Sequence, residues 1–163
     1  MSLKYVEQCT QLLAEQKLKI AFVESATAGR LAAEFSMTEH AGKCLLGSLV
    51  CYDACIKQDL LKVPKELIDQ FTPESAEVTE AIAKNVKQFF SADIIVGVTG
   101  LASPGGSETP QKPVGTMFFH IIIQEQSYKH REVFQGGAEE VILQAIDRIA
   151  QLLMQYLKQQ NTL

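Results

Sequence analysis

The sequence lacks several patterns that mark common classes of protein. None of its 163 residues is tryptophan, its four cysteines form no Cys-x-x-Cys pair, and its three histidines form no His-x-x-x-His pair. Cysteine and histidine at such spacings are the usual ligands of structural zinc, so we predict no structural metal and no disulfide. Cysteines used in this way are typical of small buried side chains in a reducing compartment.

Long apolar runs and blocks of one charge are also missing. No apolar segment reaches the roughly 18 residues that a membrane span requires, and no charged-apolar-small segment opens the chain. Lysine and arginine total 15 against 19 acidic residues, and no dense basic block is present to hold a nucleic-acid backbone. We therefore expect a cytoplasmic protein that binds neither membranes nor nucleic acid.

The residues that are present fit one globular domain over positions 1–163. Hydrophobic residues make up 47% of the chain, enough for an ordinary core. Strands that alternate with helices and then end in a hairpin predict an α/β fold, with a mixed β-sheet and helices on both faces. Pro64 is expected to open a short helix. Hydrophobic spacing predicts helices over 3–16, 26–36, 54–63, 76–90 and 138–157, and strands over 19–25, 44–53, 93–99, 114–124 and 128–135.

The stretch ESATAGR, residues 24–30, lies where the first predicted strand passes into a helix. Ligands of such sheets bind beyond the carboxyl ends of the strands, and free backbone N–H groups at a helix start suit an anion or a developing oxyanion. Ser25 and Thr27 are candidates for such a site. The alternative is that either residue caps the helix. The stretch matches neither the G-x-S-x-G nucleophile motif nor the phosphate-binding P-loop.

The stretch CYDACIK places Tyr52 and Lys57 just past another predicted strand. Lys57 is flanked by Ile56 and Leu60, and partial burial would lower its pKa from about 10.4 toward the range of a general base. A serine beside it would form a Ser-Lys pair. The alternative is an exposed lysine on a helix.

A loop rich in Gly, Pro, Ser and Thr, residues 100–116, joins two predicted core strands. Gly105 and Gly106 permit close approach of a ligand to the backbone, and the prolines restrict the loop before it binds. Lys112, the only lysine or arginine in the loop, is a candidate to face a phosphate. A purely structural turn is the alternative, although loops of this length usually carry function.

Four stretches, VESATAG, VCYDACIKQDLLKV, GVTGLASPGG and TPQKPVGT, resemble in order and spacing those of the CinA C-terminal domain family, whose characterised enzymes are nicotinamide mononucleotide deamidases. The resemblance covers about residues 3–157. It implies a three-layer αβα sandwich, a homo-oligomer, and hydrolysis of the carboxamide of nicotinamide mononucleotide to nicotinic acid mononucleotide and ammonia. Neither a metal nor a cofactor is expected for this reaction.

The resemblance also implies roles for individual residues. Ser25 is the expected nucleophile, Lys57 its general base, and Tyr52 a residue that orients Lys57 or relays a proton. Backbone N–H groups at the start of the helix beginning at Ala26 would stabilise the oxyanion, which completes a Ser-Lys variant of triad chemistry. Substrate is expected to contact Thr27, Gly29, Arg30, Thr99, Gly100, Gly105, Gly106 and Lys112.

The chain departs from the family pattern at several positions. Ala26 and Ala28 replace a cysteine and a glycine of the serine motif, and Ser103 replaces a glycine of the loop motif. The methyl group of Ala28 is expected to narrow the approach of substrate.

Near the carboxyl end, residues 136–138 and 141–142 stand where the family has Gly-Asp-Arg and Val-Arg, so two arginines are absent. If either holds the phosphate, a strong charge-assisted contact is lost. Arg30 would then supply a replacement cation, or it is simply an exposed helix residue. Two alternatives to mononucleotide hydrolysis follow: a protein that binds a nucleotide-like ligand with little or no catalysis, and an amidase with another substrate.

Overall fold

A computed structural model describes residues 3–160, so the outermost residues of the predicted domain, 1–2 and 161–163, lie outside it. The described chain forms one five-stranded sheet in the order β2-β1-β3-β4-β5. Strand β1 pairs in parallel with β2 and β3, whereas β4 is antiparallel to both β3 and β5. The mixed sheet is therefore as predicted. The strands are β1 (Ile20–Glu24), β2 (Leu45–Val50), β3 (Ile94–Gly100), β4 (Thr116–Ile123) and β5 (Gln126–Val133).

Burial explains why the central strands read as unbroken apolar runs. Every residue of β1 and β4 is buried, as is every residue of β3 before Gly100. Strands covered on both faces have no polar side, so the usual alternation of polar and apolar residues disappears. The outer strand β5 alternates between exposed and half-buried positions, as expected at an edge.

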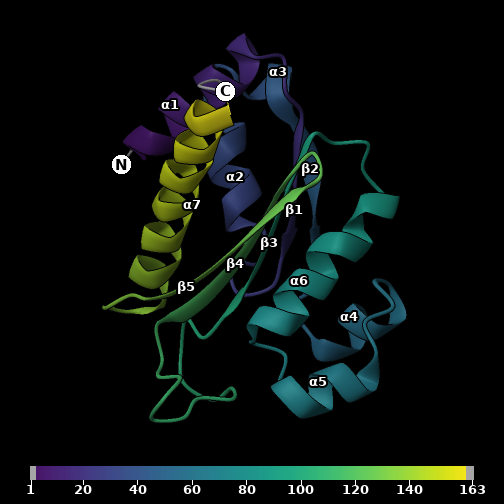
Figure 1. Cartoon of the computed structure of the whole chain (residues 1–163). Coiled ribbons are helices and arrows are strands. Elements are labelled where there is room, and N and C mark those ends of the chain that lie inside the picture. Colours follow the sequence, from purple (N-terminus) through teal and green to yellow (C-terminus); the bar gives the residue numbers. More distant parts are fainter. Residues whose placement is uncertain (1–2, 161–163) are drawn as a thin grey trace.

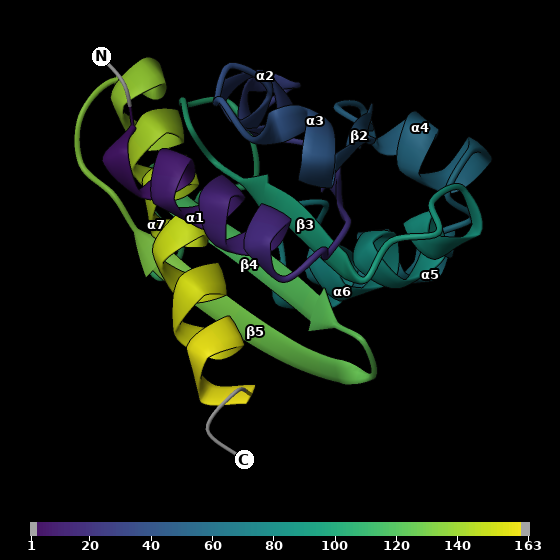
Figure 2. The ribbon, with the colours of Figure 1, turned by 90° about the horizontal axis from the view of Figure 1, so that it is seen from above.

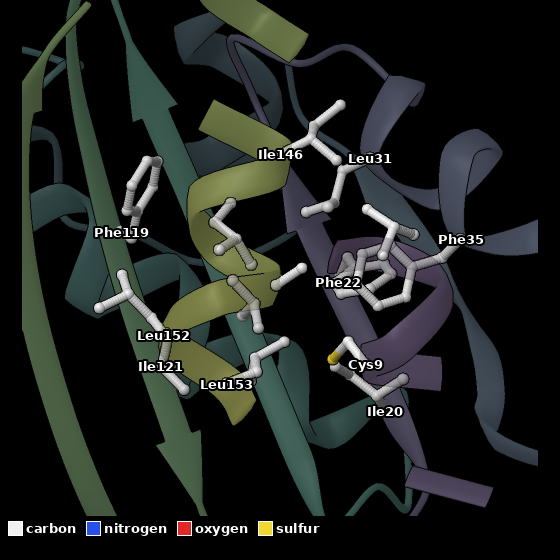
Figure 3. Packing of buried hydrophobic residues seen from close by; sticks show 14 of the residues in the cluster. Cys9, Ile20, Phe22, Leu31, Phe35, Phe119, Ile121, Ile146, Leu152 and Leu153 are labelled. Carbon is white, nitrogen blue, oxygen red and sulfur yellow. The ribbon is translucent and has the colours of Figure 1, made fainter. Parts of the chain in front are cut away.

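One face of the sheet is covered by α1 (Lys4–Glu15), α2 (Arg30–Ser36), α3 (Ala41–Cys44) and α7 (Ala138–Gln160) (Figure 1). The core on this side interleaves Phe22 of β1, Phe35 of α2 and Leu153 of α7 (Figure 3). The rings of Phe22 and Phe35 meet edge to face, with centroids 4.9 Å apart. Such an arrangement places the positive ring edge against the negative ring face and adds to the stabilisation from burial.

The opposite face is covered by α4 (Ala54–Asp59), α5 (Lys65–Phe71) and α6 (Ala76–Asn85), the last continued by the short 3₁₀ helix η1 (Val86–Gln88). Ile82 of α6 and Ile95 of β3 belong to the core on this side. Seen from above, α1 and α7 lie on one side of the strands and α5 and α6 on the other (Figure 2). The predicted three-layer αβα sandwich is confirmed.

Several predicted boundaries were wrong. The helix expected from residue 26 begins at Arg30, after a turn, and the helix expected to reach Phe90 leaves regular α geometry at Asn85. Pro64 caps α5 with an extended backbone and is not the first helical residue. None of the described helices is both long and apolar enough to cross a membrane.

Parallel pairing decides where the polar strand ends meet. Glu24, the last residue of β1, lies opposite Val50 of β2 and Val98 of β3. The residues that follow these three strands therefore gather at one edge of the sheet. This edge carries Ser25, the segment leading into α4, and the loop that begins at Gly100.

Candidate active site

Ser25 is held at the carboxyl edge of the sheet by the strand that precedes it and by a tight turn. Its amide donates to the carbonyl of Val98 at 2.9 Å, which continues the β1–β3 pairing by one residue. Its carbonyl accepts from the amide of Ala28 at 3.0 Å, which closes the turn. The side chain is buried and reaches a cavity at this edge.

Lys57 projects from α4 toward Ser25. Helix α4 is fixed at its start by Asp53, whose carboxylate accepts from the Cys55 amide at 2.8 Å, the usual geometry of a cap. Lys57 is only 1% exposed. Its Nζ lies 2.9 Å from the Ser25 Oγ, 2.7 Å from the Cys51 carbonyl oxygen and 3.2 Å from the Tyr52 carbonyl oxygen. The structure thus brings Ser25 and Lys57 into direct contact.

The surroundings of Lys57 shift its titration toward the uncharged amine. Burial lowers its pKa, because a buried ammonium loses its hydration, and the more distant acidic groups offset this only in part. A neutral amine has two N–H groups and one lone pair. In the structure the Nζ donates to the Ser25 Oγ as well as to the carbonyls of Cys51 and Tyr52. In the neutral amine the two carbonyls can take both N–H groups, which leaves the lone pair for the Ser25 hydroxyl, the arrangement of a general base beside a nucleophile.

Glu24 organises the turn that carries Ser25. This fully buried carboxylate accepts hydrogen bonds from the Thr27 hydroxyl at 2.6 Å and from the Ser48 hydroxyl of β2 at 2.7 Å. It also accepts from three backbone amides at the start of α2, at 3.0 to 3.1 Å; these belong to Gly29, Leu31 and Ala32. Glu24 therefore links the start of α2 to strands β1 and β2.

This network corrects two expectations about the helix start. Neither Ser25 nor Thr27 caps α2, because the cap position is Gly29 and a carboxylate from the preceding strand occupies the helix amides. Those amides are consequently unable to serve as the oxyanion site. The amide of Ala26, next to Ser25, has no hydrogen-bond acceptor in the described chain, and Ala26 is a residue of the cavity lining, so this amide remains a candidate donor.

The cavity at Ser25 has a volume of about 220 Å³. Its walls are Ser25, Ala26, Tyr52, Glu74 and residues 100–106 of the loop, so the structure places Gly100, Gly105 and Gly106 where a ligand would lie. The side chain of Tyr52 is 68% exposed and its phenol makes no hydrogen bond within residues 3–160. Tyr52 contacts Lys57 through its carbonyl oxygen and is one of the residues that line the cavity.

Lys112 lies outside the cavity lining and anchors the loop. Its Nζ lies 2.7 Å from the Thr72 Oγ1, 2.7 Å from the Ser107 Oγ and 2.9 Å from the Glu74 carbonyl oxygen. Three acceptors match the three N–H groups of an ammonium, so none is left for a phosphate. The expected ligand contact of Lys112 is replaced by a structural role that ties the loop to the segment before α6.

Arg30 also differs from its expected place. Its guanidinium pairs with Glu34 of the same helix at 2.6 Å and with Glu139 of α7 at 3.3 Å. It lines a different cavity, of about 350 Å³, together with Glu7 of α1. The structure does not bring Arg30 to Ser25, and it is not a replacement for the missing arginines at the Ser25 cavity.

The remaining expected contacts, Thr27, Gly29 and Thr99, lie outside the cavity lining. Thr99 is fully buried and its hydroxyl meets that of Thr79 on α6 at 2.8 Å. The Thr27 hydroxyl and the Gly29 amide both donate hydrogen bonds to the Glu24 carboxylate. Ala28 is exposed and outside the lining, so its methyl group does not narrow the cavity as expected; its φ of +48° shows instead a left-handed turn.

Sequence reasoning missed Glu74, which stands in the cavity wall. It precedes the capping residue Ser75 of α6, and the stretch TPES gave only the signal of a helix start. Nothing local shows that the segment before α6 meets the loop from β3. That contact exists because Lys112 and Ser107 both reach back to it across more than 30 residues.

Away from the cavity, one group of side chains has the spacing of metal ligands. Glu7, Glu39 and His40 each place a ligand atom within 4.8 Å of the others. The four cysteines are free. Ser25 and Lys57 stand apart from this group, and the chemistry of the cavity is that of a hydroxyl beside an amine.

The structure is thus that of an αβα protein in which a buried serine and a buried lysine meet at the carboxyl edge of a mixed sheet. The model of the CinA C-terminal domain matches residues 3–157, so the chain belongs to this family. A CinA-like protein of Petrotoga mobilis is 36% identical over 131 residues, which are 80% of this chain and 32% of that protein. A CinA-like protein of Synechococcus is 41% identical over 103 residues, 63% of this chain and 24% of that protein. The chain thus spans about a quarter to a third of the length of these curated relatives.

Solved structures share the fold. The competence damage-inducible protein A of Klebsiella pneumoniae superposes with a TM-score of 0.90 at 23% identity, over 96% of this chain and 97% of that one. A competence-damaged protein superfamily member of Escherichia coli gives 0.87 at 25% identity, over 96% and 90%. The three-layer arrangement is therefore that of the family.

Proposed function

We propose that the chain is a metal-independent amidohydrolase that converts the carboxamide of a nicotinamide nucleotide to the acid and ammonia. Nicotinamide mononucleotide, which yields nicotinic acid mononucleotide, is the reference substrate that the family resemblance implies. The observation that carries the proposal is the 2.9 Å hydrogen bond between the Lys57 Nζ and the Ser25 Oγ beside a cavity. Amide hydrolysis needs a nucleophile, a proton carrier and an oxyanion donor, and Ser25, Lys57 and the Ala26 amide are suited to these three roles.

Acylation follows from the protonation of the pair. Neutral Lys57 takes the proton of the Ser25 hydroxyl while the Oγ forms a bond to the carboxamide carbon, and negative charge develops on the carboxamide oxygen. The amide of Ala26 is suited to receive that charge. The new ammonium of Lys57 is stabilised by the carbonyl oxygens of Cys51 and Tyr52, which already lie within 2.7 to 3.2 Å.

In the release of ammonia and of the acid, Lys57 gives back the proton that it has accepted, first to the leaving nitrogen and later to Ser25. The carbon–nitrogen bond breaks as Lys57 returns its proton to the nitrogen, which leaves an ester on Ser25 and restores the neutral amine. Water then attacks the ester carbon and gives a proton to Lys57. The carbon–Oγ bond breaks, the proton returns to Ser25, and the acid departs. One water is consumed and one ammonia is formed.

Ammonia release from nicotinamide mononucleotide tests the proposal. We expect Ser25→Ala and Lys57→Met each to lower kcat by at least about 10²-fold, the usual worth of a positioned base. Ser36→Ala and Lys65→Met are matched controls, because both residues are exposed and lie outside the cavity lining. Far-ultraviolet circular dichroism and the melting temperature show whether each variant folds.

Two results would contradict the proposal. One is turnover by the Ser25→Ala variant equal to that of the wild type. The other is binding of the mononucleotide, measured by calorimetry, without ammonia release by the wild-type chain on this substrate, nicotinamide riboside or nicotinamide. That second result would favour the alternative of a ligand-binding protein without catalysis.

A further inference from the structure

The charge of the cavity wall bears on which amide enters it. The lining contains one carboxyl group, that of Glu74, and no lysine, arginine or histidine. The Oε2 of Glu74 accepts from the Ser107 hydroxyl, while its Oε1 accepts no hydrogen bond within the described chain. One carboxylate oxygen therefore remains free to meet a ligand.

Lys112 and Arg30, the two cationic residues expected to contact a phosphate, are paired with other residues of the chain. All three N–H groups of Lys112 have acceptors in the loop and the segment before α6. Arg30 is paired with Glu34 and Glu139. A phosphate at this cavity would meet a carboxylate and no free side-chain cation of the described residues that line it.

The start of α7, which lies outside the lining of the Ser25 cavity, also carries acidic residues. Here the family pattern has an arginine within Gly-Asp-Arg, whereas this chain continues from Gly137 and Ala138 into Glu139 and Glu140. The Glu140 carboxylate accepts from the Gly137 amide at 2.7 Å and so occupies the helix end itself. The Arg30–Glu139 ion pair shows that this end lies beside the start of α2. The Gly137 amide at the start of α7 is therefore already occupied by a carboxylate of the chain.

The shape and the aromatic wall favour a small cation. A volume of about 220 Å³ lies below the ~300–1,000 Å³ of typical small-molecule sites, so it suits part of a nucleotide. Tyr52, which is largely exposed, lines the same cavity as Glu74 and is its only aromatic lining residue among those described. An aromatic face and a carboxylate both attract a pyridinium ring, the first through its quadrupole and the second through its charge.

From these observations we propose that the Ser25 cavity selects a cationic, phosphate-free aromatic amide, such as the pyridinium nucleoside nicotinamide riboside, over its phosphorylated counterpart. This specificity rests on the proposed amidohydrolase function. Glu74 is the residue that determines it, because its carboxylate attracts the ring and repels the phosphate. The chemistry at Ser25 and Lys57 is the same for both substrates.

Nicotinamide riboside and nicotinamide mononucleotide form a matched pair, since they differ only in the phosphate. We expect kcat/KM for the riboside to exceed that for the mononucleotide by at least about tenfold at low ionic strength. The excess should shrink as salt is raised, because added ions screen the repulsion. The ratio of the two constants is the informative quantity, because any change in the reactivity of Lys57 affects both substrates and cancels.

The variant Glu74→Gln keeps an acceptor for Ser107 and removes the charge. It should reduce the riboside preference by about tenfold, whereas Glu77→Gln, the same charge change at an exposed position outside the lining, should leave it unchanged. Equal or higher kcat/KM for the mononucleotide in the wild type would overturn the specificity and leave the proposed function standing. Ammonia release from neither substrate would instead overturn the proposed function.

Discussion

The Nζ of Lys57 lies 2.9 Å from the Oγ of Ser25, and its two other acceptors are main-chain carbonyl oxygens. No carboxylate touches the amine directly within residues 3–160. Because carbonyl dipoles stabilise an ammonium less than an adjacent negative charge does, burial prevails and the pKa of Lys57 is lowered. This pairing makes the dependence of the reaction on pH predictable.

We expect kcat/KM to rise with pH through the lowered pKa of Lys57 and to reach a plateau below about pH 10.4, the ordinary value for lysine. The value of kcat/KM should rise, and not fall, with pH because only the neutral amine of Lys57 accepts the Ser25 proton. Lys57→Arg should lose activity, since a guanidinium stays charged throughout this range. A pH profile of initial ammonia release measures the effect, and a rise that continues unchanged past pH 10.4 would contradict it.

Glu24→Gln should destabilise the fold strongly. The carboxylate accepts five hydrogen bonds in a fully buried position, and the amide nitrogen of glutamine would face donors in place of an acceptor. We expect a loss of about 3 kcal/mol in the free energy of unfolding, as for other buried charged networks that lose a partner. Ser48→Ala removes only one of these bonds and should cost about 1.5 kcal/mol. Urea denaturation of the two variants measures both losses of unfolding free energy. Equal losses for Glu24→Gln and Ser48→Ala would show that the network does not depend on the carboxylate.

Backbone geometry at residues 28 and 29 predicts opposite effects of exchanging alanine and glycine. Ala28 has a φ of +48° and is exposed, so Ala28→Gly removes left-handed strain and should raise the free energy of unfolding by about 1 kcal/mol. Gly29 has a φ of +95°, which alanine rarely adopts, so Gly29→Ala should lower it by at least about 1 kcal/mol. Thermal and urea unfolding measure both. Destabilisation by Ala28→Gly would mean that the lost chain entropy exceeds the strain.

His120 should make stability sensitive to mild acid. It is 1% exposed, neither ring nitrogen has a hydrogen-bond partner within the described chain, and burial lowers its pKa. The charges that act on the ring are Glu80 and Lys84 of α6 and Lys129 of β5. Because the folded state favours the neutral ring, the unfolded chain binds a proton first as pH falls below about 6.5, and the free energy of unfolding decreases.

His120→Leu should reduce the slope of unfolding free energy between pH 7.5 and 5.5 and raise stability by about 1 kcal/mol at pH 7.5, because an unpaired buried polar group is removed. The pKa of His130 is also lowered by burial, so part of the pH dependence of the unfolding free energy should remain in the His120→Leu variant. Glu80 contributes only at lower pH, since its carboxyl pKa is held at about 2 by Lys129 and Lys84 and its stabilising effect is lost below about pH 4.5. An unchanged slope in the His120 variant would contradict the assignment.

The sequence predicted the parts of this protein that depend on local pattern. Unbroken apolar runs marked the buried strands, and the order of strands, helices and hairpin indicated a mixed sheet with two helical layers. Local chemistry also singled out Ser25 and Lys57, which lie 32 positions apart and meet in the structure. Helix starts were less predictable, because the first amides of α2 are bound by Glu24, which lies six residues before the helix in the preceding strand.

What the sequence determined by itself is the fold class and the two candidate residues Ser25 and Lys57, because hydrophobic periodicity and strand ends are properties of short stretches. Only the tertiary structure decided the surroundings of those side chains. It placed Glu74 in the cavity wall, turned Lys112 back onto Thr72, and paired Arg30 with Glu139. Long charged side chains reach several partners equally well, and which one they meet depends on how distant segments pack.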